Sequence, residues 1–205
     1  SLGIPASISA RGTCWGTSGA PTTNCAAEGG TTTGVFTHAR NGMNPNTTYY
    51  YRGYATNTSG TGYSPDGTFV TLSIAPTVTT TASASSITQT TAIGGGNTTS
   101  NGGSVVTVAG LTWSTTANPT YAGGGPISGS TGQTTDGWAL GGPWTSTMTG
   151  LICNTLHHFR AYAKNAIGTS YGNDTTFTTS ACNTSPVITT PNSSAITSTG
   201  ATLEA

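Results

Sequence analysis

Charged residues are almost absent from this chain. Its 205 residues include five Lys or Arg and five Asp or Glu, so the formal net charge is zero. Nucleic-acid binding needs a basic surface that neutralises phosphates, and nucleic acid is therefore not expected as a partner. Apolar runs are short too, and none approaches the roughly 18 residues of a membrane-spanning helix. A membrane span is not expected either.

Helix-forming residues are also scarce, since the chain has one Lys, two Glu and few Leu. Threonine is the commonest residue with 47 copies, and glycine follows with 30. Thr is β-branched and fits the pleated surface of a strand, while Gly, Asn, Ser and Pro supply turns. This composition predicts either an all-β protein or a disordered Thr-rich stalk. Four Trp, eight Tyr and four Cys favour the folded protein, because these residues are mostly buried.

An internal repeat organises the sequence. Residues 44–71 align without gaps with residues 152–179, at an offset of 108. Upstream, Trp15 aligns with Trp113 at an offset of 98. The second copy therefore carries about ten extra residues between its Trp and its Tyr-rich strand.

A third match places the opening of a repeat at the end of the sequence. Residues 75–93 resemble residues 185–203, and 75–93 opens the second copy. The first copy lacks such an opening. We therefore predict three parts: an incomplete module (1–74), a complete module (75–184) and a segment that opens a further copy (185–205).

The run MNPNTTYYYRGYATN, followed by GTGYSPDGTF, resembles strands F and G of a fibronectin type III or immunoglobulin-like module. The likeness is greatest to the tandem modules of secreted and surface proteins of bacteria, and it covers essentially the whole chain. It implies sandwiches of two antiparallel sheets built from seven short strands. The expected fold is thus all-β, with two such modules. The first lacks strands A and B, and the C-terminal segment supplies strands A and B of a further module.

In this family a Leu-x-Pro-x-Thr-x-Tyr run holds a tyrosine corner. The first copy fills these places with Met43, Pro45, Thr47 and Tyr49, and the second with Leu151, Cys153, Thr155 and His157. Because side chains alternate along a strand, one face of each Tyr-rich strand is expected to point into the core. These core positions are Tyr49, Tyr51, Gly53 and Ala55, and then His157, Phe159, Ala161 and Ala163. The outward residues either contact a ligand or pack across strands; they are Tyr50, Arg52 and Tyr54, and then His158, Arg160 and Tyr162.

Four cysteines allow three disulfide pairings. Cys14 and Cys25 have no counterparts in the second copy, and their spacing suits neighbouring strands. The resemblance places Cys153 before strand F and Cys182 after strand G, at the same end of a sandwich. We predict the disulfides Cys14–Cys25 and Cys153–Cys182, with free buried thiols as the alternative. Disulfides persist outside the cytoplasm, so a secreted, cell-surface-associated protein is expected.

The sequence offers little catalytic or metal-binding chemistry. His157 and His158 are adjacent in a strand and point to opposite faces, and no C-x-x-C spacing suggests zinc. We expect no enzyme, no metal and no cofactor. Trp138 and Trp144, in the longer interval of the second copy, are the candidate ligand contacts, and the alternative is that they cap the sandwich.

The repeat pattern leads to a functional prediction. We expect a structural subunit of an extracellular filament or surface assembly, with copies of itself as head-to-tail partners through strand addition. The predicted interface residues are Ser1, Leu2, Val187, Ile188, Ile196, Ala201 and Leu203. A covalent continuation in a tandem array stays open. The alternative function is an adhesin or carbohydrate-binding module that contacts glycans.

Overall fold

The computed structural model describes residues 7–81, 83–125, 127–136, 142–183 and 192–204. These residues form fifteen β-strands and no helix, which confirms the all-β prediction. None of them belongs to a helix that could cross a membrane. Below, residues 7–74 are called the first module, 75–183 the second module and 192–204 the C-terminal hairpin; the domain boundaries remain a prediction.

The first module holds a single five-stranded antiparallel sheet. Its order is β2-β1-β3-β4, and β5 also pairs with β3. The strands are β1 (Ala10–Gly16), β2 (Cys25–Ala27), β3 (Thr48–Asn57), β4 (Gly60–Tyr63) and β5 (Gly67–Val70). Among residues 7–74 no second sheet faces it.

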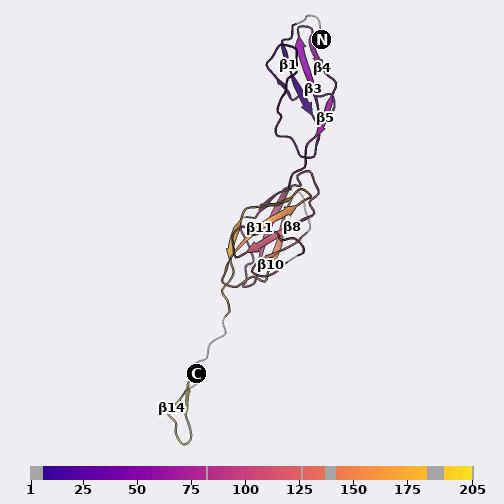
Figure 1. Cartoon of the computed structure of the whole chain (residues 1–205). Helices are drawn as coiled ribbons and strands as arrows, with labels where there is room; N and C mark the ends of the chain where they lie inside the picture. Colours follow the sequence, from indigo (N-terminus) through magenta and orange to yellow (C-terminus); the bar gives the residue numbers. More distant parts are fainter. Residues whose placement is uncertain (1–6, 82, 126, 137–141, 184–191, 205) are drawn as a thin grey trace.

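The second module is a sandwich of two sheets (Figure 1). One sheet has the order β10-β7-β6, from β6 (Thr77–Thr80), β7 (Thr91–Ser100) and β10 (Pro143–Thr149). The other has the order β9-β8-β11-β12, with β13 also on β11. Its strands are β8 (Val108–Ser114), β9 (Gly132–Gln133), β11 (Leu156–Lys164), β12 (Thr169–Tyr171) and β13 (Thr175–Thr178).

The core of the second module lies between these sheets. Its buried members are Val78, Ala92, Val106, Ala109, Leu111, Trp113, Met148, Leu151, Phe159, Ala161, Ala163 and Phe177. Gly94 of β7 lets the two layers approach each other closely, since an added Cβ there would lie 2.8 Å from Cε2 of Phe159. A strand rich in glycine is weak alone, so the packing of this layer stabilises it.

The two modules repeat one ladder in the same register. Trp15 lies opposite Tyr51 in the β1–β3 ladder, and Trp113 lies opposite Phe159 in the β8–β11 ladder. The corner loops correspond as well: the Asn44 N–H donates to Tyr49 Oη at 3.0 Å. His157 Nε2 lies 3.3 Å from the Ile152 carbonyl, so a histidine takes the corner position in the second copy.

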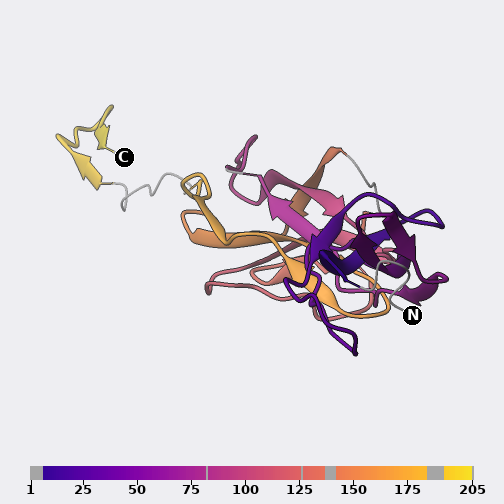
Figure 2. The same cartoon turned by 90° about the horizontal axis from the view of Figure 1, so that it is seen from above.

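A short junction joins the modules. The Ile74 N–H donates to the Gly102 carbonyl at 2.8 Å, and Asn46 Nδ2 donates to the Gly103 carbonyl at 2.8 Å. The C-terminal hairpin consists of β14 (Asn192–Ser194) and β15 (Thr202–Glu204). Within the described part of the chain these two strands pair only with each other (Figures 1 and 2).

Candidate assembly face of the first module

Aromatic side chains that form a core in the second module remain partly exposed in the first. Tyr51 and Phe69 are 45% and 38% exposed, and Tyr49 stacks on Phe69 with ring centroids 5.8 Å apart. Their counterparts Phe159 and Phe177 are 0% and 6% exposed. We call the surface formed by Trp15, Tyr51 and Phe69 the open face; Tyr49, which packs beneath it, is 4% exposed.

The sheet β10-β7-β6 makes this difference, because it covers the corresponding positions of the second module. Gly94 of β7 lies against Phe159, and the Met148 side chain of β10 is fully buried. On the β6 side, the Ala161 N–H donates to Thr80 Oγ1 at 3.1 Å. The open face thus has the composition of one half of a sandwich core.

Two hollows lie on the inner side of the first module. One, of about 480 Å³, is lined by Thr13, Trp15, Met43, Tyr51 and Phe69 together with residues 36–40. It borders Tyr51, whose counterpart Phe159 lies against Gly94 of β7 in the second module.

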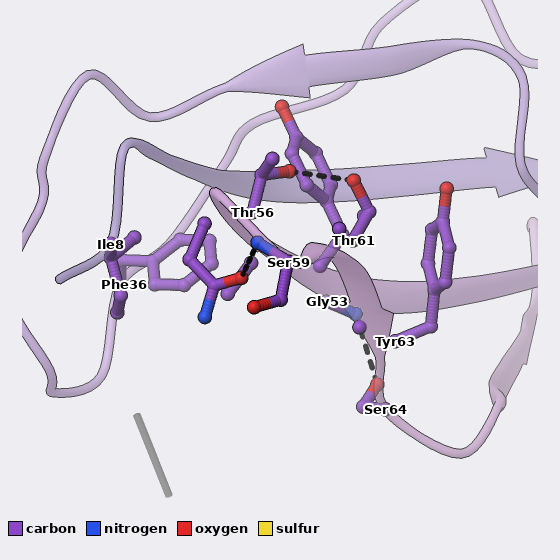
Figure 3. A pocket seen from close by; sticks show the side chains of 13 residues that line it. Ile8, Phe36, Gly53, Thr56, Ser59, Thr61, Tyr63 and Ser64 are labelled. Carbon is purple, nitrogen blue, oxygen red and sulfur yellow. Dashed lines mark hydrogen bonds between the residues drawn. The ribbon is translucent and has the colours of Figure 1, made fainter. Parts of the chain in front are cut away.

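The other hollow, of about 720 Å³, lies toward the β3–β4 turn. Figure 3 shows Ile8 and Phe36 on one side of it and Tyr63 and Ser64 on the other. The Gly53 N–H here donates to Ser64 Oγ at 3.0 Å, whereas its counterpart Ala161 donates to Thr80 of β6.

Ser64 also limits how a strand can enter this second hollow. Its counterpart Gly172 lies so close to β6 that an added Cβ would be 2.3 Å from the Thr80 nitrogen. A strand that takes the place of β6 must therefore shift outward at Ser64.

The segment between β2 and β3 partly covers the open face with polar groups. Arg11 Nε donates to Glu28 Oε2 at 2.7 Å, and this hydrogen bond lowers the pKa of the Glu28 carboxyl and raises that of Arg11. The Arg11 guanidinium also lies 4.9 Å from the Phe36 ring centroid. Residues 35–41 align with β10 at the offset of 108, yet they form no strand. Their counterpart β10 pairs with β7, for which the described residues of the first module hold no equivalent.

The C-terminal hairpin has the conformation of the turn that precedes β7. The Thr88 N–H donates to the Thr91 carbonyl at 2.9 Å, and the Thr197 N–H donates to the Gly200 carbonyl at 2.7 Å. Backbone pairing follows the same pattern, since Ser85 faces Ile93 and Ser194 faces Thr202.

Backbone dihedral angles support this correspondence. Ser86 has a φ of 48° and Ala195 a φ of 50°, an uncommon conformation for residues other than glycine. All these matches share an offset of 109. The hairpin therefore resembles the turn before β7 in both sequence and backbone conformation.

Only part of the predicted interface lies within the described residues. Ile196 is 73% exposed, Ala201 is exposed, and Leu203 lies in β15 opposite Ser193. Four further predicted residues lie outside the described residues: Ser1, Leu2, Val187 and Ile188.

Of the two tryptophans expected to contact a ligand, the structure describes only Trp144. Trp144 lies in β10 opposite Gly96, and its half-buried ring packs against the core. Trp138 lies outside the described residues. The roughly ten extra residues of the second copy do not include Trp144. Because Gln133 pairs with Thr112 as Cys25 pairs with Cys14, the insertion falls between β8 and β9 and does not include Trp144.

That insertion explains why the expected outward stripe of the second copy is not exposed. Tyr121, within the insertion, stacks on Tyr162 with ring centroids 4.4 Å apart. Tyr162 is fully buried, and its hydroxyl donates to the Thr134 carbonyl at 2.7 Å. Arg160 lies over the Tyr171 ring. His158 Nδ1 and Asp174 Oδ2 are hydrogen-bonded at 2.6 Å. These outward residues pack across strands. The ten-residue difference in length was the sequence signal for this cover.

Both disulfides have the predicted pairing. Cys14–Cys25 joins β1 to β2, and Cys153–Cys182 joins the loop before β11 to the segment after β13. Among the described residues, no group of three or more His, Cys, Asp or Glu could hold a metal ion.

Comparisons with known proteins yield structural likeness only. No protein-family model and no curated protein sequence matches the chain. The sensor domain of the anti-sigma factor RsgI4 in Pseudobacteroides cellulosolvens is 18% identical, with a TM-score of 0.35, over 52% of this chain and 96% of that one.

Two multidomain structures are also similar. The chicken CNTN1 FN1–FN3 domains are 15% identical, with a TM-score of 0.39, over 83% of this chain and 55% of theirs. A set of titin domains is 18% identical, with a TM-score of 0.33, over 64% of this chain and 40% of theirs. The β-sandwich fold assignment rests on the strand pairings described above.

Proposed function

We propose that this chain is a structural β-sandwich unit of an extracellular assembly, in which strand addition completes the first module. The opening segment of another copy, residues 185–204, covers the open face. One observation carries the proposal: Tyr51 and Phe69 are 45% and 38% exposed where Phe159 and Phe177 are buried.

Two further features support this function, the conformation of the C-terminal hairpin and the two disulfides. The C-terminal hairpin repeats the backbone hydrogen bonds of the turn before β7, so it is preformed for the same role. Strand addition supplies main-chain hydrogen bonds and places alternate side chains in pockets. A head-to-tail contact of this kind does not close, so it propagates. Two disulfides suit an oxidising environment outside the cytoplasm.

Self-association of the 205-residue chain tests the proposal. We expect sedimentation velocity to show species that grow with concentration, and electron microscopy to show filaments. A peptide of residues 185–204, added in excess, caps the open face and shortens them. The same peptide with Ile188 and Ile196 changed to Asp is the matched control. The proposal is overturned if the chain stays monomeric at high concentration and does not bind the peptide.

A covalent tandem array uses the same pairing within one polypeptide, and mass measurement separates the two arrangements. Material from the natural source, denatured and reduced, gives a chain near 20.4 kDa if separate copies associate. A much larger chain shows that successive repeats of one polypeptide complete each other.

A further inference from the structure

The turn before β7 is anchored in the second module by two backbone hydrogen bonds. The Ser180 N–H donates to the Thr88 carbonyl, and the Leu151 N–H donates to the Thr90 carbonyl, both at 3.0 Å. Ser180 Oγ adds a longer contact of 3.4 Å to the Ile87 carbonyl. Leu151 precedes β11 and Ser180 follows β13, so the turn ties together the two loops at this end of the sandwich.

The first module builds the same pair of loops. Thr71 Oγ1 accepts the Thr47 N–H at 3.0 Å and donates to the Asn44 carbonyl at 2.5 Å. Thr179 Oγ1 accepts the Thr155 N–H at 3.0 Å and donates to the Ile152 carbonyl at 2.6 Å. The loops therefore superimpose at an offset of 108.

This superposition gives Met43 and Leu72 the positions of Leu151 and Ser180. In the described part of the chain, no backbone carbonyl accepts a hydrogen bond from the N–H of Met43 or Leu72. The anchoring surface is thus formed in the first module, and among residues 7–74 no turn equivalent to 86–91 lies on it.

Two exposed apolar side chains mark the same place. Leu72 is 86% exposed in the first module, and Ile196 is 73% exposed in the C-terminal hairpin. Leu72 has the position of Ser180, whose hydroxyl contacts the backbone carbonyl of Ile87. Ile196 has the position of Ile87 at the offset of 109. Docking of the hairpin on the loops brings these two side chains together.

We propose that residues 195–200 of one copy dock on the loop pair of the first module in a second copy. The Leu72 N–H donates to the Thr197 carbonyl, and the Met43 N–H donates to the Thr199 carbonyl. Leu72 and Ile196 bury each other, where the second module has a hydrogen bond from the Ser180 hydroxyl to the Ile87 backbone carbonyl. This inference rests on the proposed function and adds the register and the contacting residues.

Disulfide trapping between separate chains tests the register. Leu72→Cys and Ile196→Cys are prepared separately and mixed under mild oxidation; Cys pairs form only at Cα separations below about 7 Å. We expect a disulfide-linked dimer of one chain of each kind. Val105→Cys, at a residue 66% exposed in the second module, replaces Leu72→Cys in the control and gives no such dimer.

Association of the unmodified chain separates the two possible failures. If that chain associates but Leu72→Cys is not trapped, or is trapped no better than Val105→Cys, the register is wrong and strand addition still stands. If the unmodified chain does not associate, the proposed function itself fails.

A charge-exchange series gives a second, independent readout. Leu72→Asp weakens association by about tenfold or more, because it removes a buried apolar contact. Leu72→Asp mixed with Ile196→Lys recovers part of the loss. Equal association by Leu72→Asp and the unmodified chain overturns the proposal. Hydrogen exchange of the β1–β3 amides, unchanged in the Leu72→Asp variant, shows that the first module is intact.

Discussion

Tyr51 and Phe159 occupy the same position in two copies of one ladder, opposite Trp15 and Trp113 respectively. Phe159 is fully buried, whereas Tyr51 keeps 45% of its surface exposed. Local sequence and strand register are equivalent at the two places. The difference therefore comes from the presence of β6, β7 and β10 over one of them.

Alanine substitution at these two positions should have unequal effects on stability. Phe159→Ala is expected to lower the free energy of unfolding of the second module by about 3–5 kcal/mol, because it leaves a core cavity. Tyr51→Ala in the unassembled chain should cost about 1 kcal/mol or less, as for an exposed side chain. Urea unfolding monitored by fluorescence measures both. Equal losses would show that the open face is already a packed core.

Burial of Tyr162 raises the pKa of its phenol, with smaller contributions from Tyr121 and Asp136. The folded state thus favours the neutral phenol. Its stabilising effect is complete below the ordinary tyrosine pKa of about 10 and is lost as pH rises toward the folded-state value. In an alkaline titration at 295 nm we expect Tyr162 to ionise only as the second module unfolds. Tyr162→Phe should remove this late step; its persistence would contradict the assignment.

The two disulfides close loops of different length. Cys14 and Cys25 are 11 residues apart, and Cys153 and Cys182 are 29 apart. The loop-entropy model predicts losses of roughly 3 and 3.5 kcal/mol when each pair is replaced by Ser. Because the first module has an open face, we expect its sheet to unfold more readily in the Cys14→Ser/Cys25→Ser variant than the second module unfolds in the Cys153→Ser/Cys182→Ser variant. Hydrogen exchange of the β1–β3 amides measures this, with the β8–β11 amides as the internal control.

Gly94 provides a test of the close contact between the two sheets. Gly94→Ala places a Cβ near Phe159 and Leu111 and should destabilise the second module by about 1–3 kcal/mol through overpacking. Gly62, whose added Cβ meets nothing within 4 Å, is the matched control in the first module. A neutral Gly94→Ala would mean that the sheets can separate without cost.

Much of the fold could be predicted from the sequence. Alternation along the Tyr-rich strands placed Phe159 and Ala161 in the core, and the repeat aligned β3 with β11. These features follow from local strand geometry, in which neighbouring side chains point to opposite faces. The cysteine pairing followed from which strands and loops lie side by side in a sandwich.

Other features depend on segments that have no counterpart in the other copy of the repeat, or whose alignment between the copies was unknown. The cover over Tyr162 comes from the insertion between β8 and β9, and its position could not be read from an alignment in which only the total length differed. Trp144 was predicted as a ligand contact because it lies in the longer interval of the second copy. In the structure it belongs to β10, where it packs against the core.

The sequence by itself determined the strand composition and the internal repeat, including the likeness of residues 185–203 to residues 75–93, because these depend on residue type and local periodicity. The tertiary structure decided which aromatic positions are buried and which remain open. It also fixed the register of the C-terminal hairpin, through the shared turn of Thr88 and Thr197. Burial requires a second layer from a distant part of the chain or from another copy, and no local pattern records whether that layer is present.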